Sequence, residues 1–335
     1  MIDEASCTEH GNSPRSCWVV SDGAAGNERQ ALALADALDL HPRIVRLDLA
    51  APWSWLAPRL DLGARYAIRT RDGTSIAEPW PQIAIGCGRK AALLTRVLRQ
   101  WSNGRCFSVQ MLDPRIDPAA FDLVIAPLHD RLDGHNVIAT LGALNRVNDE
   151  TLASARAHFA HLAALPVPRT AVLIGGPHRA QALDPAWLDA LRELLQTAHT
   201  RDGGSFLVST SRRTPAHIVE RLRTDFARWP GAFWAGDADG ENPYAGFLAW
   251  AQRILVSPDS VNMLSEACAV GVPASSLVTR PLSGKLADFH ARLAAHGHLT
   301  AFGAPRHPAV AALRESASVA AQVFARWNEQ VQGAS

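Results

Sequence analysis

Short apolar runs alternate with amphipathic helical stretches along this chain, and the alternation starts twice. The first series runs from a strand expected at residues 16–20 to a helix expected at about 149–165. The second series begins with a strand at 171–174, directly after the proline-rich stretch 165–169. Alternation of this kind indicates parallel sheets covered by helices. We therefore predict an α/β protein with two Rossmann-like domains joined at the proline-rich stretch.

The predicted first domain covers residues 1–165, and the second covers residues 169–308. An amphipathic stretch at about 309–330 is expected to form a last helix. Ligands of such folds bind at the carboxyl ends of the strands. Two domains that face each other also form a cleft, and such clefts are the usual place for a ligand.

The composition excludes several classes of function. The net charge is +1 and 19% of the residues are charged, so we expect no nucleic-acid partner. No apolar run approaches the ~20 residues of a membrane span, and the polar start does not resemble a signal peptide. The 5 cysteines form no Cys-x-x-Cys pair, which is typical of reduced thiols. We expect a cytoplasmic protein, either free or peripheral at the inner membrane surface.

Residues 258–273 are expected to form a short helix directly after a buried strand. Asp259 and Ser260 carry side-chain oxygens of the kind that cap helix starts. A glycine at 271 followed by a proline at 273 is typical of a helix end. The helix N-terminus then lies at the carboxyl end of the strand, where its dipole favours an anion such as phosphate.

Two polar residues of this helix, Asn262 and Glu266, are four positions apart and therefore share a face. A carboxylate below a helix N-terminus suits a ligand with phosphates at one end and paired hydroxyls nearby, such as a nucleotide ribose. Ser260, Asn262 and Glu266 are therefore candidate nucleotide ligands. The alternative is a capped amphipathic helix whose Glu266 only faces solvent.

Two further segments of the second half are expected at the same sheet edge. Gly175 and Gly176 follow its first strand, and glycines let a backbone approach a pyrophosphate closely. Ser211, Arg212 and Arg213 follow its second strand and offer a hydroxyl and forked cations to phosphate oxygens. A surface turn or a solvated arginine pair would explain each signal alone. Together they predict a diphosphate site.

Candidates for a general base lie in the first half. Asp22, His129 and Asp130 are expected at or just past the carboxyl ends of strands, where a base can activate an acceptor hydroxyl. A hydrogen-bonded loop would explain the same residues. The segment 86–91 matches the Gly-x-Gly-x-x-Ala pattern of dinucleotide-binding folds, so an NAD(P)-binding oxidoreductase is a further alternative. The histidines lack the spacing of a metal site, and no metal is predicted.

The chain resembles the "elongated mitochondria" family of mitochondrial-fission proteins, which is known in plants and widespread in bacteria. The resemblance covers about residues 17–327 and rests on the segments 19–23, 26–35, 127–130, 136–138, 173–177 and 259–267. The family is similar in turn to GT-B glycosyltransferases. Their donor motif, Glu-Ala-x-x-x-Gly-x-Pro, is matched here by Glu266, Ala267, Gly271 and Pro273.

The resemblance implies a GT-B-like fold with two Rossmann-like domains across a cleft and a C-terminal helix that crosses back to the first domain. It implies that Glu266 holds the ribose of a nucleotide sugar, which is a substrate, so no cofactor is expected. The expected activity is metal-independent transfer of a sugar to an envelope or lipid-linked acceptor bound by the first domain. The plant member is described as an adaptor in organelle division, so a non-catalytic adaptor on the same fold is the alternative.

Overall fold

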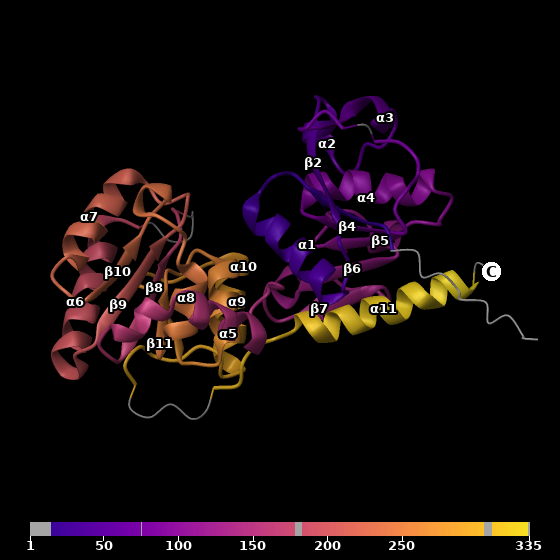
Figure 1. The fold of residues 1–335 in the computed structure, drawn as a ribbon. Coiled ribbons are helices and arrows are strands. Elements are labelled where there is room, and N and C mark those ends of the chain that lie inside the picture. Colours follow the sequence, from indigo (N-terminus) through magenta and orange to yellow (C-terminus); the bar gives the residue numbers. More distant parts are fainter. Residues whose placement is uncertain (1–14, 75, 178–182, 305–309, 334–335) are drawn as a thin grey trace, which may run out of the picture. The chain divides into compact units, whose positions relative to one another are not determined.

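The computed structural model describes residues 15–74, 76–177, 183–304 and 310–333 (Figure 1). The chain forms two compact units. Unit 1 takes residues from Met1–Ile125, Gly134–Val137 and Ala320–Ser335, and unit 2 takes residues from Ala126–Asp133 and Ile138–Val319. By this division residues 149–165, which the sequence prediction placed in the first domain, lie in unit 2.

The first sheet has seven strands in the order β3-β2-β1-β4-β5-β6-β7. Its strands are β1 (Cys17–Ser21), β2 (Arg43–Leu49), β3 (Ile68–Thr70), β4 (Ile83–Cys87), β5 (Phe107–Met111), β6 (Leu123–Pro127) and β7 (Val137–Thr140). The pairs β2–β1, β1–β4, β4–β5 and β5–β6 are parallel, and β3 joins its neighbour β2 in the antiparallel sense. Every residue of β1, β4, β5 and β6 is buried, which explains why most of their side chains are apolar, although Ser108 and Gln110 of β5 are buried polar residues.

The helices of unit 1 are α1 (Ala25–Ala37), α2 (Trp53–Leu56), α3 (Ala64–Ala67) and α4 (Arg89–Trp101), with a 3₁₀ turn η1 (Pro118–Ala120). Gly86 lets α4 lie close to β4, because a Cβ there would come within 2.0 Å of the Thr95 hydroxyl oxygen. The first glycine of the dinucleotide-like pattern therefore has a packing role in this protein.

The second sheet has five strands in the order β10-β9-β8-β11-β12, and all four neighbouring pairs are parallel. Its strands are β8 (Arg169–Ile174), β9 (Ser205–Thr210), β10 (Gly231–Trp234), β11 (Arg253–Val256) and β12 (Ala274–Ser276). The chain proceeds from β8 to β9 and β10 on one side, and then returns to β11 and β12 on the other. The neighbours β8 and β11 therefore form a topological switch point, where ligands of open α/β sheets bind.

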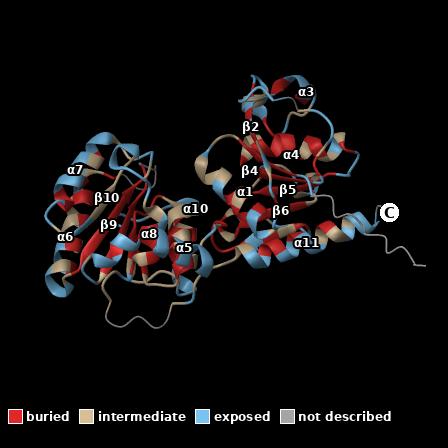
Figure 2. Cartoon of the chain, viewed as in Figure 1, coloured by how far each residue is buried: buried red, intermediate tan, exposed pale blue. Residues whose placement is uncertain are grey.

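The helices between these strands bury one side against the sheet, and Figure 2 shows the buried residues gathered along the strands. Helices α6 (Pro185–Asp202), α7 (Ala216–Phe226), α8 (Tyr244–Trp250) and α9 (Val261–Val270) lie between these strands, with a 3₁₀ turn η4 (Asp237–Asp239). Before β8 come η2 (Leu128–Asp130), α5 (Asp149–His158) and η3 (Ala160–Ala164), and α10 (Gly284–Ala295) follows β12. Helix α10 was not predicted. Leu286, Phe289 and Leu293 are its buried positions, and their helical spacing was the available signal.

The last helix, α11 (Ser316–Gly333), reaches unit 1, as the predicted fold class requires. Trp327 stacks on Phe107 with ring centroids 6.5 Å apart, and the Gln330 amide donates a hydrogen bond to the Gly104 carbonyl. The helix begins later than predicted because the preceding Glu315 carboxylate accepts two backbone N–H groups of the loop after β7. Within the described ranges, no helix has the length and apolar character needed to cross a bilayer.

Candidate functional site

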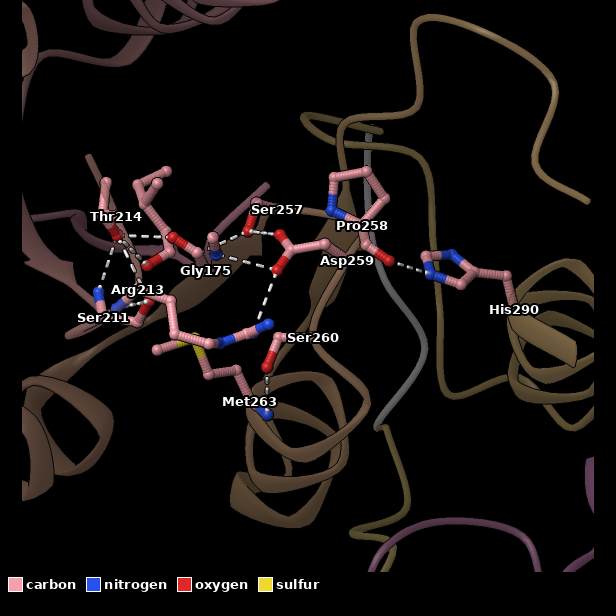
Figure 3. A network of polar contacts seen from close by, with 12 residues as sticks. Gly175, Ser211, Arg213, Thr214, Ser257, Pro258, Asp259, Ser260, Met263 and His290 are labelled. Carbon is pink, nitrogen blue, oxygen red and sulfur yellow. Dashed lines mark hydrogen bonds and ion pairs between the residues drawn. The ribbon is translucent and has the colours of Figure 1, made fainter. Parts of the chain in front are cut away.

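The candidate site lies in unit 2 at the carboxyl ends of β8 and β11 (Figure 3). Gly175 and Gly176 follow β8, and the segment 257–260 follows β11. Because β8 and β11 pair in parallel, these two segments lie side by side. The loop after β9, which carries Ser211, contacts the same edge.

Asp259 is the buried centre of this edge. Its side chain has 0% exposure and accepts hydrogen bonds from the Gly176 N–H at 2.9 Å and the Ser257 hydroxyl at 2.6 Å, while Ser257 accepts the Gly175 N–H at 2.7 Å. A guanidinium nitrogen of Arg213 lies 3.4 Å from the carboxylate. Burial raises the pKa of Asp259, and these hydrogen bonds and the arginine charge oppose that rise. The predicted helix-cap role of Asp259 is therefore wrong, because its carboxylate turns to the glycine loop.

Gly175 and Gly176 leave space that the Asp259 and Arg213 side chains fill. A Cβ at Gly175 would lie 2.1 Å from Oδ2 of Asp259, and one at Gly176 would lie 2.6 Å from Cβ of Arg213. Both glycine N–H groups already donate to Ser257 or Asp259. Pyrophosphate binding by these N–H groups stays a prediction, and a ligand that used them would have to replace both bonds.

The loop after β9 presents two arginines at the rim. Its Ser211 hydroxyl accepts the Arg213 N–H, and Thr214 donates a hydrogen bond to the Gly175 carbonyl, so the loop is tied to β8. The Arg213 side chain is 60% exposed, and Arg212 is exposed as well. Arg213 therefore lies beside the glycine loop (Figure 3), Arg212 precedes it in the same exposed loop, and the Ser211 hydroxyl holds the turn.

Helix α9 carries the predicted carboxylate. Asn262 and Glu266 are partly exposed, and the Tyr244 hydroxyl, from the start of α8, donates a hydrogen bond to Glu266. A carboxylate accepts several hydrogen bonds at once, so this bond orients Glu266 without using its whole capacity. The Ser260 hydroxyl oxygen caps the helix by accepting the N–H of Met263 at 3.4 Å, as predicted.

His290 of α10 supports the loop that holds Asp259. Its Nε2 lies 3.0 Å from the Pro258 carbonyl oxygen. A carbonyl only accepts hydrogen bonds, so Nε2 carries the hydrogen. Burial lowers the pKa of His290, and the bond to Pro258 opposes that effect. At neutral pH the histidine is therefore uncharged.

His129 and Asp130 lie together in η2, within unit 2. The His129 ring packs edge-on against Phe289 of α10 at 5.2 Å, and its Nδ1 is buried without a hydrogen-bond partner in the described part of the chain. Burial lowers the pKa of His129, which the charge of Asp130 opposes. The Asp130 carboxylate accepts a hydrogen bond from the Lys285 ammonium at 2.7 Å.

Asp22 belongs to unit 1. Its carboxylate accepts the N–H of Ala24 at 3.0 Å and so shapes the turn between β1 and α1. The guanidinium of Arg71 donates a hydrogen bond to the Asp22 carbonyl. The predicted catalytic role of Asp22 stays a prediction.

Several contributors to the site were not recognised in the sequence. They are Thr214, Tyr244, Ser257, Lys285 and His290. No local pattern marks them, because each has a partner far along the chain; for Ser257 this is the Gly175 N–H, in addition to its bond to the nearby Asp259. Only the apolar spacing of α10 would have placed two of them on a helix.

Residues 25–327 match the family model described as Mitochondrial fission ELM1. The chain belongs to this family. The predicted family relationship is thereby confirmed. The ELM1-family chain is 30% identical over 251 residues to the mitochondrial fission protein ELM1 of Arabidopsis thaliana, an alignment that covers 66% of this chain and 57% of the plant protein. It is 26% identical over 298 residues to the uncharacterized protein RP120 of Rickettsia prowazekii, covering 76% and 81% of the two chains.

Solved structures show the same architecture at low sequence identity. The UDP-GlcNAc 2-epimerase of Methanocaldococcus jannaschii matches with a TM-score of 0.52 and 13% identity, over 92% of this chain and 99% of the epimerase. The UDP-N-acetylglucosamine 2-epimerase of Rickettsia bellii matches with a TM-score of 0.50 and 12% identity, over 96% and 97%. The predicted fold class is confirmed: this ELM1-family protein has a GT-B-like α/β fold with two parallel sheets.

Proposed function

We propose that this ELM1-family protein binds a nucleotide sugar at the carboxyl edge of the second sheet and transfers the sugar to an envelope or lipid-linked acceptor. The observation that supports the proposal is the position of Arg213 beside Gly176 and Asp259, at the sheet edge where the capped start of α9 lies. Arg212 precedes Arg213 in the same exposed loop, and Glu266 follows on α9. Two cations and a helix N-terminus suit a diphosphate. A carboxylate on the same helix suits the hydroxyls of a ribose.

Arg213 has a partner before the ligand arrives. Its 3.4 Å contact with Asp259 is long for an ion pair, and the guanidinium is 60% exposed, so a diphosphate competes with a weak interaction. Asp259 remains held by Ser257 and Gly176 when the arginine turns to the ligand. The guanidinium groups then stabilise the negative charge that develops on the leaving diphosphate.

Helix α10 connects the proposed donor site with His129. Phe289 packs against the His129 ring, and the next residue, His290, bonds the Pro258 carbonyl beside Asp259. Because burial lowers the pKa of His129, its imidazole is neutral at pH 7 and able to accept a proton. We therefore assign the general base to His129, with Asp130 held beside it by Lys285. Asp22 is proposed to act on the acceptor side in unit 1.

Ligand binding tests the proposal directly. The fold neighbours named as UDP-GlcNAc 2-epimerases make UDP and UDP-sugars the first probes, with GDP and NAD(P) as comparisons. A nucleotide at ~100 times its Kd stabilises the protein by about 2.7 kcal/mol, which a thermal-shift assay detects. Glu266→Gln keeps the shape and removes the charge, and we expect about tenfold weaker binding. Glu220→Gln, at an exposed position of α7, is the matched control and should leave binding unchanged.

A second candidate function is a non-catalytic adaptor, which the name of the Arabidopsis relative, a mitochondrial fission protein, favours. A folded sample that gives no shift with any nucleoside diphosphate would contradict nucleotide-sugar binding and favour the adaptor. A shift with NAD(P) alone would favour the oxidoreductase. Release of free sugar or nucleoside diphosphate from a bound UDP-sugar, lost in His129→Gln, would support transfer.

A further inference from the structure

Large apolar side chains are exposed together on one small segment of unit 1. The described residues include eight exposed large hydrophobic side chains, and four of them fall within residues 55–66. Their exposures are 75% for Trp55, 49% for Leu56, 81% for Leu62 and 84% for Tyr66. Single exposed apolar residues need no explanation, but a cluster of this kind marks an interaction surface. We call residues 53–69, which include α2 and α3, the tryptophan lobe.

Arg89, at the start of α4, holds the backbone of the tryptophan lobe through hydrogen bonds. Its guanidinium donates hydrogen bonds to the carbonyls of Trp55 at 3.0 Å, Ala57 at 2.8 Å and Ser54 at 3.1 Å. The arginine of the dinucleotide-like pattern is therefore engaged with this lobe and does not present its charge to an anion at the start of α4.

A second set of contacts fixes the rest of the lobe. Arg96 donates to the Pro58 carbonyl at 3.1 Å and pairs with Asp61 at 2.9 Å. The indole N–H of Trp53 donates to the Leu62 carbonyl at 3.0 Å, and Trp53 packs partly buried against the core of unit 1. The lobe therefore has its own anchors, and the exposed apolar side chains stand out from a backbone that is held in place.

The exposed charged side chains of the lobe are mostly arginines. Arg59 and Arg69 are exposed, and neither has a side-chain hydrogen bond or ion pair within the described part of the chain. Arg65 is also exposed and lies over the Trp101 ring at 5.5 Å. The acidic Asp61 is neutralised by its pair with an arginine of α4. The lobe thus combines unpaired cations with tryptophan, tyrosine and leucine.

We propose that the tryptophan lobe docks on an anionic membrane surface. Trp55 and Tyr66 have amphipathic rings of the kind that settle at the headgroup level, and Leu56 and Leu62 add apolar area below it. Arg59 and Arg69 meet the anionic headgroups. A protein partner is less suited to two one-turn helices flanked by unpaired arginines, because interface centres are depleted of charge. This inference does not depend on nucleotide binding, although it would bring a lipid-linked acceptor to unit 1.

Sedimentation with lipid vesicles tests the proposal. The full chain is mixed with vesicles of phosphatidylcholine alone or with phosphatidylglycerol added, and the bound fraction is measured against lipid concentration. We expect binding to the anionic vesicles. Each of Arg59→Gln and Arg69→Gln should weaken it about fivefold, since one basic side chain near such a surface contributes about 1 kcal/mol. Trp55→Ser with Tyr66→Ser should weaken it at least as much.

The matched control is Val167→Ser with Val278→Ser, two exposed apolar residues outside the lobe at 62% and 42% exposure. This variant should bind vesicles as the unchanged protein does. The proposal is overturned if the protein binds neither vesicle, or if the control variant loses as much binding as the lobe variants. It is also overturned if the lobe variants abolish self-association in sedimentation velocity while vesicle binding is absent. An unchanged UDP thermal shift in the lobe variants separates this result from the fate of the transferase proposal.

Discussion

Replacing Gly175 by alanine tests whether the Asp259 carboxylate fills the space beside this glycine. An added Cβ would lie 2.1 Å from Oδ2 of Asp259 and 2.6 Å from its Cγ. Gly175 is not among the positive-φ residues, so its backbone conformation suits alanine. The cost of the substitution therefore comes from the collision with the carboxylate and not from backbone strain.

The loss in free energy of unfolding can be estimated in two ways, according to whether Asp259 stays in place or moves aside. Forcing a methyl group into a filled site costs about 1–3 kcal/mol. If Asp259 moves aside instead, the buried N–H of Gly176 and the hydroxyl of Ser257 lose their acceptor, at about 1–3 kcal/mol each. We expect Gly175→Ala to lower the free energy of unfolding by about 2–4 kcal/mol. Urea unfolding measures this loss, and hydrogen exchange of the peptide that contains β8 locates it.

A double-mutant cycle isolates the contact. In an Asp259→Ala background the new methyl group at Gly175 meets no carboxylate, so its additional cost should fall below about 0.5 kcal/mol, which gives a coupling of about 1.5–4 kcal/mol. Arg213→Ala is the control, because it removes only a long ion pair with an exposed guanidinium and should cost less than about 1 kcal/mol. Equal costs of Gly175→Ala in both backgrounds would refute the reasoning.

Three further predictions concern other parts of the chain. Gly86→Ala places a Cβ 2.0 Å from the Thr95 hydroxyl oxygen and should lower the free energy of unfolding, measured in urea, by about 1–3 kcal/mol. Adding Thr95→Ala should recover part of this stability, and no recovery would contradict a collision with the Thr95 side chain. Burial lowers the pKa of His129, so the unfolded chain takes up its proton first, and stability should fall as the pH drops from about 7 through about 6.5. His129→Gln should flatten that dependence in urea midpoints between about pH 5 and 7, and an unchanged slope would contradict the assignment. Burial raises the pKa of the Cys17, Cys106 and Cys268 thiols to about 12, so iodoacetamide should label these cysteines only after unfolding. Peptide mapping by mass spectrometry measures the labelling, and rapid labelling of the native protein would contradict the burial of the thiols.

The local parts of the fold were predictable because their causes are local. Buried parallel strands require continuous apolar runs, and β8 is one of them. The Ser260 cap and the glycine after α9 mark the ends of that helix in the sequence itself. The helix at 316–333 was recognised by its apolar spacing, but its start was misjudged because a distant loop, bonded by Glu315, decides it.

The candidate site was predictable only in part. The sequence indicated Arg212, Arg213 and Glu266 at one sheet edge, because carboxyl ends of parallel strands meet there. It did not indicate that Asp259 would occupy the glycine N–H groups, since a carboxylate before a helix fits a cap equally well. The choice was made by the neighbouring strand, which brings Ser257 and the glycine loop within reach of that side chain.

The amino-acid sequence by itself determined the α/β alternation, the family and the residue types gathered at the switch point, because periodicity and helix caps act over a few residues. Only the tertiary structure decided which of those groups meet. Trp53 and Trp55 are two positions apart and chemically identical, yet one packs against the core and the other is 75% exposed. The difference arises because Arg89, more than thirty residues away along the chain, fixes the backbone between them.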